Sequence, residues 1–136
     1  MELRTTRSLT FGAASELVGA AVRAAHDHGT PISVAVVDAQ GTLLSFARMD
    51  GAPAFSTGLA ITKAMTSATF GRATSDMEEL VAERPGFAVG FLGHGGWYVG
   101  RGGAPIVVDG ETVGAIGVSG NTAEAEDGLA KELAAG

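Results

Sequence analysis

Three histidines are the side chains of this sequence best suited to bind a metal or to transfer a proton near neutral pH. His94 lies among glycines at positions 93, 95 and 96, so a ligand can approach its imidazole closely. It could serve as an axial ligand or a general base, or it could be a solvated loop histidine. His26 and His28 stand at the end of a helical segment. There they could cap free carbonyls or, alternatively, bind a metal or an iron porphyrin.

Lys63 is the only charged residue between Pro53 and Gly71. The small and apolar residues around it are typical of an enclosed helix, in which a lysine amine needs a partner. A carboxylate such as that of Asp50 would make Lys63 structural, whereas an open pocket would make it an anion anchor or a base. Arg48 and Asp50 precede the same helix and could either pair or orient a ligand. These alternatives stay open.

Residues 86–103 combine eight glycines with the aromatic residues Phe91, Trp97 and Tyr98. So many glycines predict an irregular loop instead of a regular element. Trp97 and Tyr98 would form a ligand wall or a subunit contact. Gly102 and Gly103 end this segment, and they match neither the Walker pattern nor the dinucleotide fingerprint.

The elements that must position these residues follow from periodicity and turn residues. Apolar residues at helical spacing predict a helix over 9–29. Strands over 32–37 and 42–48 around a turn at 38–41 predict one hairpin, and strands over 104–108 and 111–118 around Asp109-Gly110 predict another. Two hairpins with helices before, between and after them predict an α+β layer fold with an antiparallel sheet.

Three further helices connect and close these hairpins. Pro53 is expected to open a helix that runs to Phe70. Ser75, with Glu78 three residues later, is expected to cap a short helix that ends before Pro85. Asn121, with a glutamate three residues later, is expected to cap the closing helix.

The composition excludes several classes of protein. The chain has no cysteine, which removes disulfides, thiolate metal sites and cysteine nucleophiles, and we predict no metal site built by the protein. A formal net charge of -6 without a cluster of Lys and Arg argues against nucleic acid and anionic membranes as partners.

The same composition bears on assembly and location. We expect the 136 residues to form one domain over 1–136. Hydrophobic residues make up 46% and charged residues 18%, and a domain of this size cannot bury so much apolar surface alone, so we expect a homo-oligomer. Residues 1–10 lack the apolar core of an export signal and no stretch reaches transmembrane length, so we expect a cytoplasmic protein.

Five short motifs follow one another along nearly the whole chain. They are Val34-Ala35-Val36-Val37-Asp38 with Gly41, Arg48-Met49-Asp50-Gly51-Ala52, Ala60 with Lys63-Ala64, Gly102-Gly103 with Pro105-Ile106, and Asp109-Gly110 leading to Val113-Gly114-Ala115-Ile116-Gly117-Val118-Ser119-Gly120. In this order they resemble the GlcG/HbpS family, whose domain also occurs at the C-terminus of PduO-type proteins. The resemblance implies a profilin-like α+β fold with a central antiparallel sheet of about five strands flanked by helices, and it implies an oligomer.

The resemblance also points to a ligand, because members of the family are described as haem-binding, haem-degrading or haem-sensing. Our first hypothesis is therefore a protein that binds haem or a related tetrapyrrole in an apolar cleft between the sheet and the second helix. A histidine, His28, His94 or His26, would be the axial ligand. Arg48, Lys63 or Arg101 would pair with the propionates.

A second hypothesis is a cofactor-free enzyme of a specialised biosynthetic pathway that performs acid/base chemistry on a small organic substrate in the same cleft. His94 would be its acid or base, Lys63 or Arg48 would stabilise an oxyanion, and residues 86–103 would form a lid. A third is an oligomeric scaffold. For the first two hypotheses, the predicted ligand-binding residues are Arg48, Asp50, Lys63, His94, Trp97, Tyr98, Gly102 and Gly103.

Overall fold

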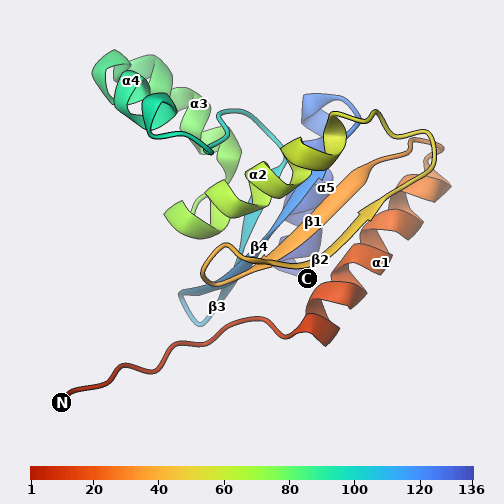
Figure 1. Cartoon of the computed structure of the whole chain (residues 1–136). Coiled ribbons are helices and arrows are strands. Elements are labelled where there is room, and N and C mark those ends of the chain that lie inside the picture. Colours follow the sequence, from red (N-terminus) through yellow and green to blue (C-terminus); the bar gives the residue numbers. More distant parts are fainter.

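The computed structural model describes residues 1–136, which form one four-stranded antiparallel sheet and five helices (Figure 1). In chain order the elements are α1 (Phe11–Asp27), β1 (Ser33–Asp38), β2 (Leu43–Arg48), α2 (Ser56–Phe70), α3 (Thr74–Glu83), α4 (Pro85–His94), β3 (Gly103–Val108), β4 (Glu111–Ser119) and α5 (Ala123–Ala135). The strand order is β2-β1-β4-β3, so both predicted hairpins are confirmed and lie side by side. The sheet has four strands and not about five, because no segment outside the two hairpins forms a strand of it.

The two faces of the sheet are covered by different helices. On the central strand β1, Val34 and Val36 belong to a core shared with α1 and α5, whereas Ala35 and Val37 belong to a core shared with α2. This split follows from the alternation of side chains along a strand. Figure 1 shows α2 on one side of the sheet and α5 on the other. The fold is therefore α+β in three layers.

Helix α2 packs directly onto its face of the sheet. The facing residues are small, among them Ala60 and Ala64 on α2 and Ala35 and Ala115 on the strands. A Cβ atom added to Gly117 would overlap the carbonyl oxygen of Ala60. This layer leaves no room for a large flat ligand. The prediction of a ligand cleft between the sheet and the second helix is therefore wrong.

Residues 85–94 are the largest local departure from the sequence prediction, because they form helix α4 and not an irregular loop. Pro85 stands at the start of the helix, where its fixed φ is already helical. The rings of Phe87 and Phe91 lie one helical turn apart with centroids at 5.4 Å, and Phe91 also contacts Phe70 of α2 at 5.3 Å. Tertiary aromatic contacts therefore outweigh the low helix propensity of the glycines.

The helix ends differ from the predictions by a few residues. Helix α2 begins at Ser56, because residues 53–55 form a turn before it. Helix α3 begins at Thr74 without a side-chain cap, so Ser75 does not have the predicted role. Helix α5 is capped by Thr122, whose side chain accepts from the amide of Ala125, and not by Asn121. None of the five helices is long and apolar enough to cross a membrane.

Candidate functional site

A pocket of about 430 Å³ lies on the face of the sheet that α1 and α5 cover. It is formed by the end of α1, the segment that leads into β1, the end of β4 and residues 125–132 of α5. Its size falls within the usual range for small-molecule sites. The lining residues are Ala24, Ala25, His28, Thr30, Ile32, Val118, Asn121, Ala125, Glu126, Leu129 and Glu132.

His28 is the one predicted histidine in this lining. It is the C-cap residue of α1, and its Nδ1 lies 2.7 Å from the carbonyl oxygen of Ala24. A carbonyl oxygen can only accept a hydrogen bond, so Nδ1 of His28 carries the proton and is the donor. The predicted capping role is therefore confirmed. In the neutral ring, the other nitrogen, Nε2, has its lone pair free.

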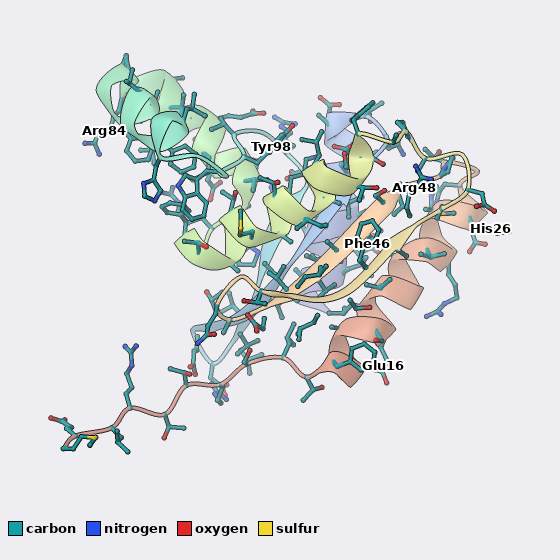
Figure 2. All side chains as sticks on the ribbon, in the orientation of Figure 1. Glu16, His26, Phe46, Arg48, Arg84 and Tyr98 are labelled. Carbon is teal, nitrogen blue, oxygen red and sulfur yellow. The ribbon has the colours of Figure 1, made fainter.

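The other two histidines lie outside the pocket lining. The side chain of His26 is 83% exposed, and its Nδ1 is 3.8 Å from a carboxylate oxygen of Asp27. Figure 2 shows His26 at the outer end of α1. His94 is exposed at the end of α4, and its ring stacks on that of Trp97 with centroids 6.0 Å apart.

Lys63 is almost completely buried, with a relative exposure of 1%. Its amine donates to Oε2 of Glu126 at 2.8 Å and to the carbonyl oxygen of Val118 at 3.0 Å. The partner carboxylate is thus Glu126 and not Asp50, which is exposed. Because both bonds are made to the protein, the amine is not open to a substrate.

Glu126 connects this ion pair to the pocket, since it is also a lining residue. Its Oε1 accepts from the backbone amides of Gly120 at 2.8 Å and Asn121 at 3.0 Å. Three donors therefore hold one buried carboxylate, an arrangement suited to its anionic form. Local sequence reasoning missed Glu126, because its main partner lies 63 positions away.

The glycines at 102 and 103 make room for Lys63. A Cβ atom on Gly102 would lie 3.0 Å from the lysine amine, and one on Gly103 would lie 2.6 Å from the carbonyl oxygen of Lys63. Gly102 also has a φ of 113°, a conformation that favours glycine. Their contacts in this structure are with the protein's own lysine.

Tyr98 lies above the buried pair, with its ring centroid 5.0 Å from the Lys63 amine. Burial raises the pKa of its hydroxyl above the ordinary value, and the charges of Glu126 and Glu78 raise it further. The backbone amide of Tyr98 donates to the hydroxyl of Thr66 on α2 at 2.8 Å. Tyr98 is labelled in Figure 2, where it lies between α2 and the projecting α3–α4 pair.

The arginines predicted to pair with propionates are not part of the pocket lining. Arg48 is exposed at the end of β2 (Figure 2). Arg101 is 40% exposed and lies 3.8 Å from a carboxylate oxygen of Glu78 and 3.9 Å from one of Glu124. The predicted site residues therefore fall into separate places: His28 at the pocket, Lys63 behind its wall, Arg48 and Asp50 on the hairpin end, and His94 and Trp97 beside α4.

Comparison with known proteins identifies the family. The sequence matches the family model described as "Haem degrading protein HbpS-like" over residues 9–135. This chain belongs to the HbpS-like family. It is also 34% identical over 118 residues to Protein GlcG of Escherichia coli (strain K12), which covers 86% of this chain and 85% of GlcG. The predicted resemblance is confirmed.

Solved structures of relatives share the fold. The crystal structure of a Streptomyces reticuli HbpS double mutant is 34% identical, with a TM-score of 0.89 over 98% of this chain and 89% of that one. The PduOC chain of a crystal structure of a PduOC:heme complex is 30% identical, with a TM-score of 0.84 over 94% of both chains. The α+β class is therefore shared with HbpS itself and with a relative crystallised with haem.

Proposed function

We propose that this protein binds haem or a closely related tetrapyrrole, with His28 as the axial ligand of the iron. The observation that carries the proposal is the orientation of the His28 ring in the pocket lining, where Nδ1 donates to the carbonyl of Ala24 at 2.7 Å. Histidines that bind metals are commonly held in this way by a carbonyl or carboxylate on their other nitrogen. The bond leaves Nε2 as the nitrogen able to bind iron.

The rest of the pocket supports the same ligand class. Its walls include Ala25, Ile32, Val118 and Leu129, which suit the face of a large apolar ring. Membership of the HbpS-like family and similarity to the PduOC chain of a haem complex add support. Bound haem would supply an iron centre for ligand binding or redox chemistry. The chain would supply the axial imidazole and the apolar walls.

The alternative of an acid/base enzyme has less support. The amine of Lys63 is buried and already donates to Glu126 and Val118. His94 is exposed and lies outside the pocket lining. Neither residue therefore faces the pocket with a free functional group.

A haemin titration followed by the Soret band tests the proposal. The wild type and the matched control His26→Ala are expected to give a saturable, stoichiometric spectral shift, because His26 lies outside the lining. His28→Ala is expected to lose the histidine-ligated spectrum and to bind at least about tenfold more weakly. A wild-type spectrum that stays that of free haemin, or a His28→Ala variant that binds like the wild type, would contradict the assignment.

We also propose that the protein is a homo-oligomer. Val89 and Leu92 on α4 are 76% and 56% exposed, and no charged residue interrupts this helix between Pro85 and His94. Such apolar surface is unusual on a monomer. Analytical ultracentrifugation should give a mass that is a multiple of 13.6 kDa, and a Val89→Glu, Leu92→Glu double variant should reduce it. A monomeric wild type would refute the proposal.

A further inference from the structure

The ionisable groups around the pocket favour only some tetrapyrroles. Among the lining residues, His28, Glu126 and Glu132 are the ones that can carry a charge. The lining contains neither lysine nor arginine, so no permanent cation faces a ligand there. A carboxylate placed in this pocket would therefore lose water without gaining a lysine or arginine partner, which is costly.

The buried amine nearest to the pocket does not change this conclusion. Lys63 contacts the far side of Glu126 and donates to Oε2 of that carboxylate and to Val118. It would have to leave Glu126 in order to reach a carboxylate of the ligand. Since the loss of one partner of a buried ion pair is strongly destabilising, the amine stays where it is.

Glu126 itself is held in place on several sides. Its two oxygens accept from Lys63, Gly120 and Asn121, and its side chain is only 8% exposed. The carboxylate therefore cannot turn away to admit another anion. Glu132, one turn or more further along α5, adds a second negative charge at the exposed rim.

Haem carries both of its propionates on one edge, and the opposite edge bears only methyl and vinyl groups. We propose that the pocket takes a tetrapyrrole by its apolar edge and leaves the carboxylates in solvent. Its ligands are then tetrapyrroles with all acidic groups on one edge, and it discriminates against those with carboxylates on every ring. This inference rests on the proposed haem function and adds the class of tetrapyrrole and its orientation.

The apolar lining fits this orientation. Six lining residues are apolar: Ala24, Ala25, Ile32, Val118, Ala125 and Leu129. Methyl and vinyl groups buried there gain the hydrophobic contribution of apolar contact. The propionates on the opposite edge keep their hydration. They therefore do not need the ion pairs with arginine that we predicted from the sequence.

Three iron porphyrins test the inference on the wild-type protein in one mixed solvent. They are haemin, its dimethyl ester, in which both propionates are neutral, and iron coproporphyrin, which carries a carboxylate on each ring. Haemin and the ester are expected to bind within about threefold of each other, and iron coproporphyrin at least about tenfold more weakly. The readout is the Soret titration together with tryptophan quenching.

Two matched charge reversals test whether the pocket itself weakens the binding of iron coproporphyrin. Glu132→Lys puts a cation at the rim and is expected to strengthen iron coproporphyrin binding by at least about fivefold. Glu16→Lys makes the same charge change at an exposed position of α1 outside the lining, and is expected to have little effect. Both residues are exposed, so neither substitution threatens the fold.

The outcomes separate this inference from the function on which it rests. Equal affinity for haemin and iron coproporphyrin, or a large loss of affinity in the ester, would overturn the proposed orientation while leaving haem binding intact. Equal effects of Glu132→Lys and Glu16→Lys would also overturn it. If none of the three porphyrins binds, the haem function and the orientation fail together.

Discussion

The amine of Lys63 on α2 lies 2.8 Å from the carboxylate of Glu126 on α5, although these helices cover opposite faces of the sheet. The lysine side chain passes the sheet beside Gly102, at the start of β3 and the end of β4. One ion pair thus joins the two outer layers of the fold. The same carboxylate holds the turn that leads into α5 and forms part of the pocket wall.

Removal of the lysine amine should therefore destabilise the protein strongly. Lys63→Met leaves the Glu126 carboxylate buried without its cation, and we expect a loss of about 3–5 kcal/mol in the free energy of unfolding. The double variant Lys63→Met, Glu126→Gln should recover part of this loss, since the uncompensated charge is gone. Urea unfolding followed by the fluorescence of the single tryptophan measures both.

Lys131→Met is the control for this experiment. Lys131 also pairs with a carboxylate at 2.8 Å, that of Asp127, but its side chain is 48% exposed. The side chain of Asp127 is 14% exposed, so this pair is partly open to solvent, and its loss is expected to destabilise the protein less than the loss of the fully buried Lys63 pair. Equal losses in Lys63→Met and Lys131→Met would show that burial of the Lys63 pair does not matter.

The close packing of α2 gives a second prediction. A methyl group on Gly117 would overlap the carbonyl oxygen of Ala60, so Gly117→Ala must push α2 away from the sheet. We expect a loss of about 1–3 kcal/mol, measured by urea unfolding. Gly58→Ala in the same helix meets no atom within 4 Å and should be neutral or stabilising by up to about 1 kcal/mol. If Gly117→Ala leaves the free energy of unfolding unchanged, the inference that α2 packs tightly against Gly117 is wrong.

The sequence predicts the sheet well because its signals are local. Strand alternation and the Asp109-Gly110 turn act over a few residues, and both hairpins form where they are expected. Helix α4 is different, since its stability depends on ring contacts with Phe70, which lies more than a dozen residues away in the sequence. Local glycine content therefore predicts the wrong structure there.

Local sequence signals predict the candidate site even less well than they predict α4. His28 could be identified as a capping residue and a candidate ligand from its place at the end of a helix. The pocket beside it, however, combines residues of α1, the segment before β1, β4 and α5, and nothing in the local sequence places these together. The partner of Lys63 could not be identified for the same reason.

Tyr98 offers a test of the buried environment around Lys63. Its pKa is raised mainly by burial and then by the charges of Glu126 and Glu78, so folding favours the neutral phenol. The stability that this contributes is fully present below the ordinary pKa of 10.0 and is lost as the pH rises through the higher folded value. Because the chain has one tyrosine, the tyrosinate absorbance reports this group alone. Titration at the same pH in native and urea-unfolded protein would contradict the prediction.

The N-terminal segment should detach in acid. Hydrogen bonds from the side chain and the backbone of Arg7 lower the pKa of Glu111 below its usual 4.5. The contribution of this pair is therefore present above pH 4.5 and is lost as the pH falls through the lower folded value. Leu9 reports the attachment, because its amide donates to the carbonyl of Val113 at 2.9 Å.

The protection of the Leu9 amide against hydrogen exchange, measured relative to its intrinsic exchange rate at each pH, should fall as the pH drops below 4.5, while the amides of β1 stay protected, since the segment lies outside the sheet. In Arg7→Gln the same amide should exchange faster already at neutral pH, because the guanidinium bonds to Glu111 and Asp109 are lost. High salt should have a similar effect on the wild type, as both partners are exposed and screened. Protection of the Leu9 amide that does not change with pH, salt or the substitution would show that the Arg7–Glu111 pair does not hold the segment. Its other contacts would then hold it: the backbone bond of Leu9, the bond from the Ala39 amide to the Ser8 hydroxyl and the packing of Leu9 against the core.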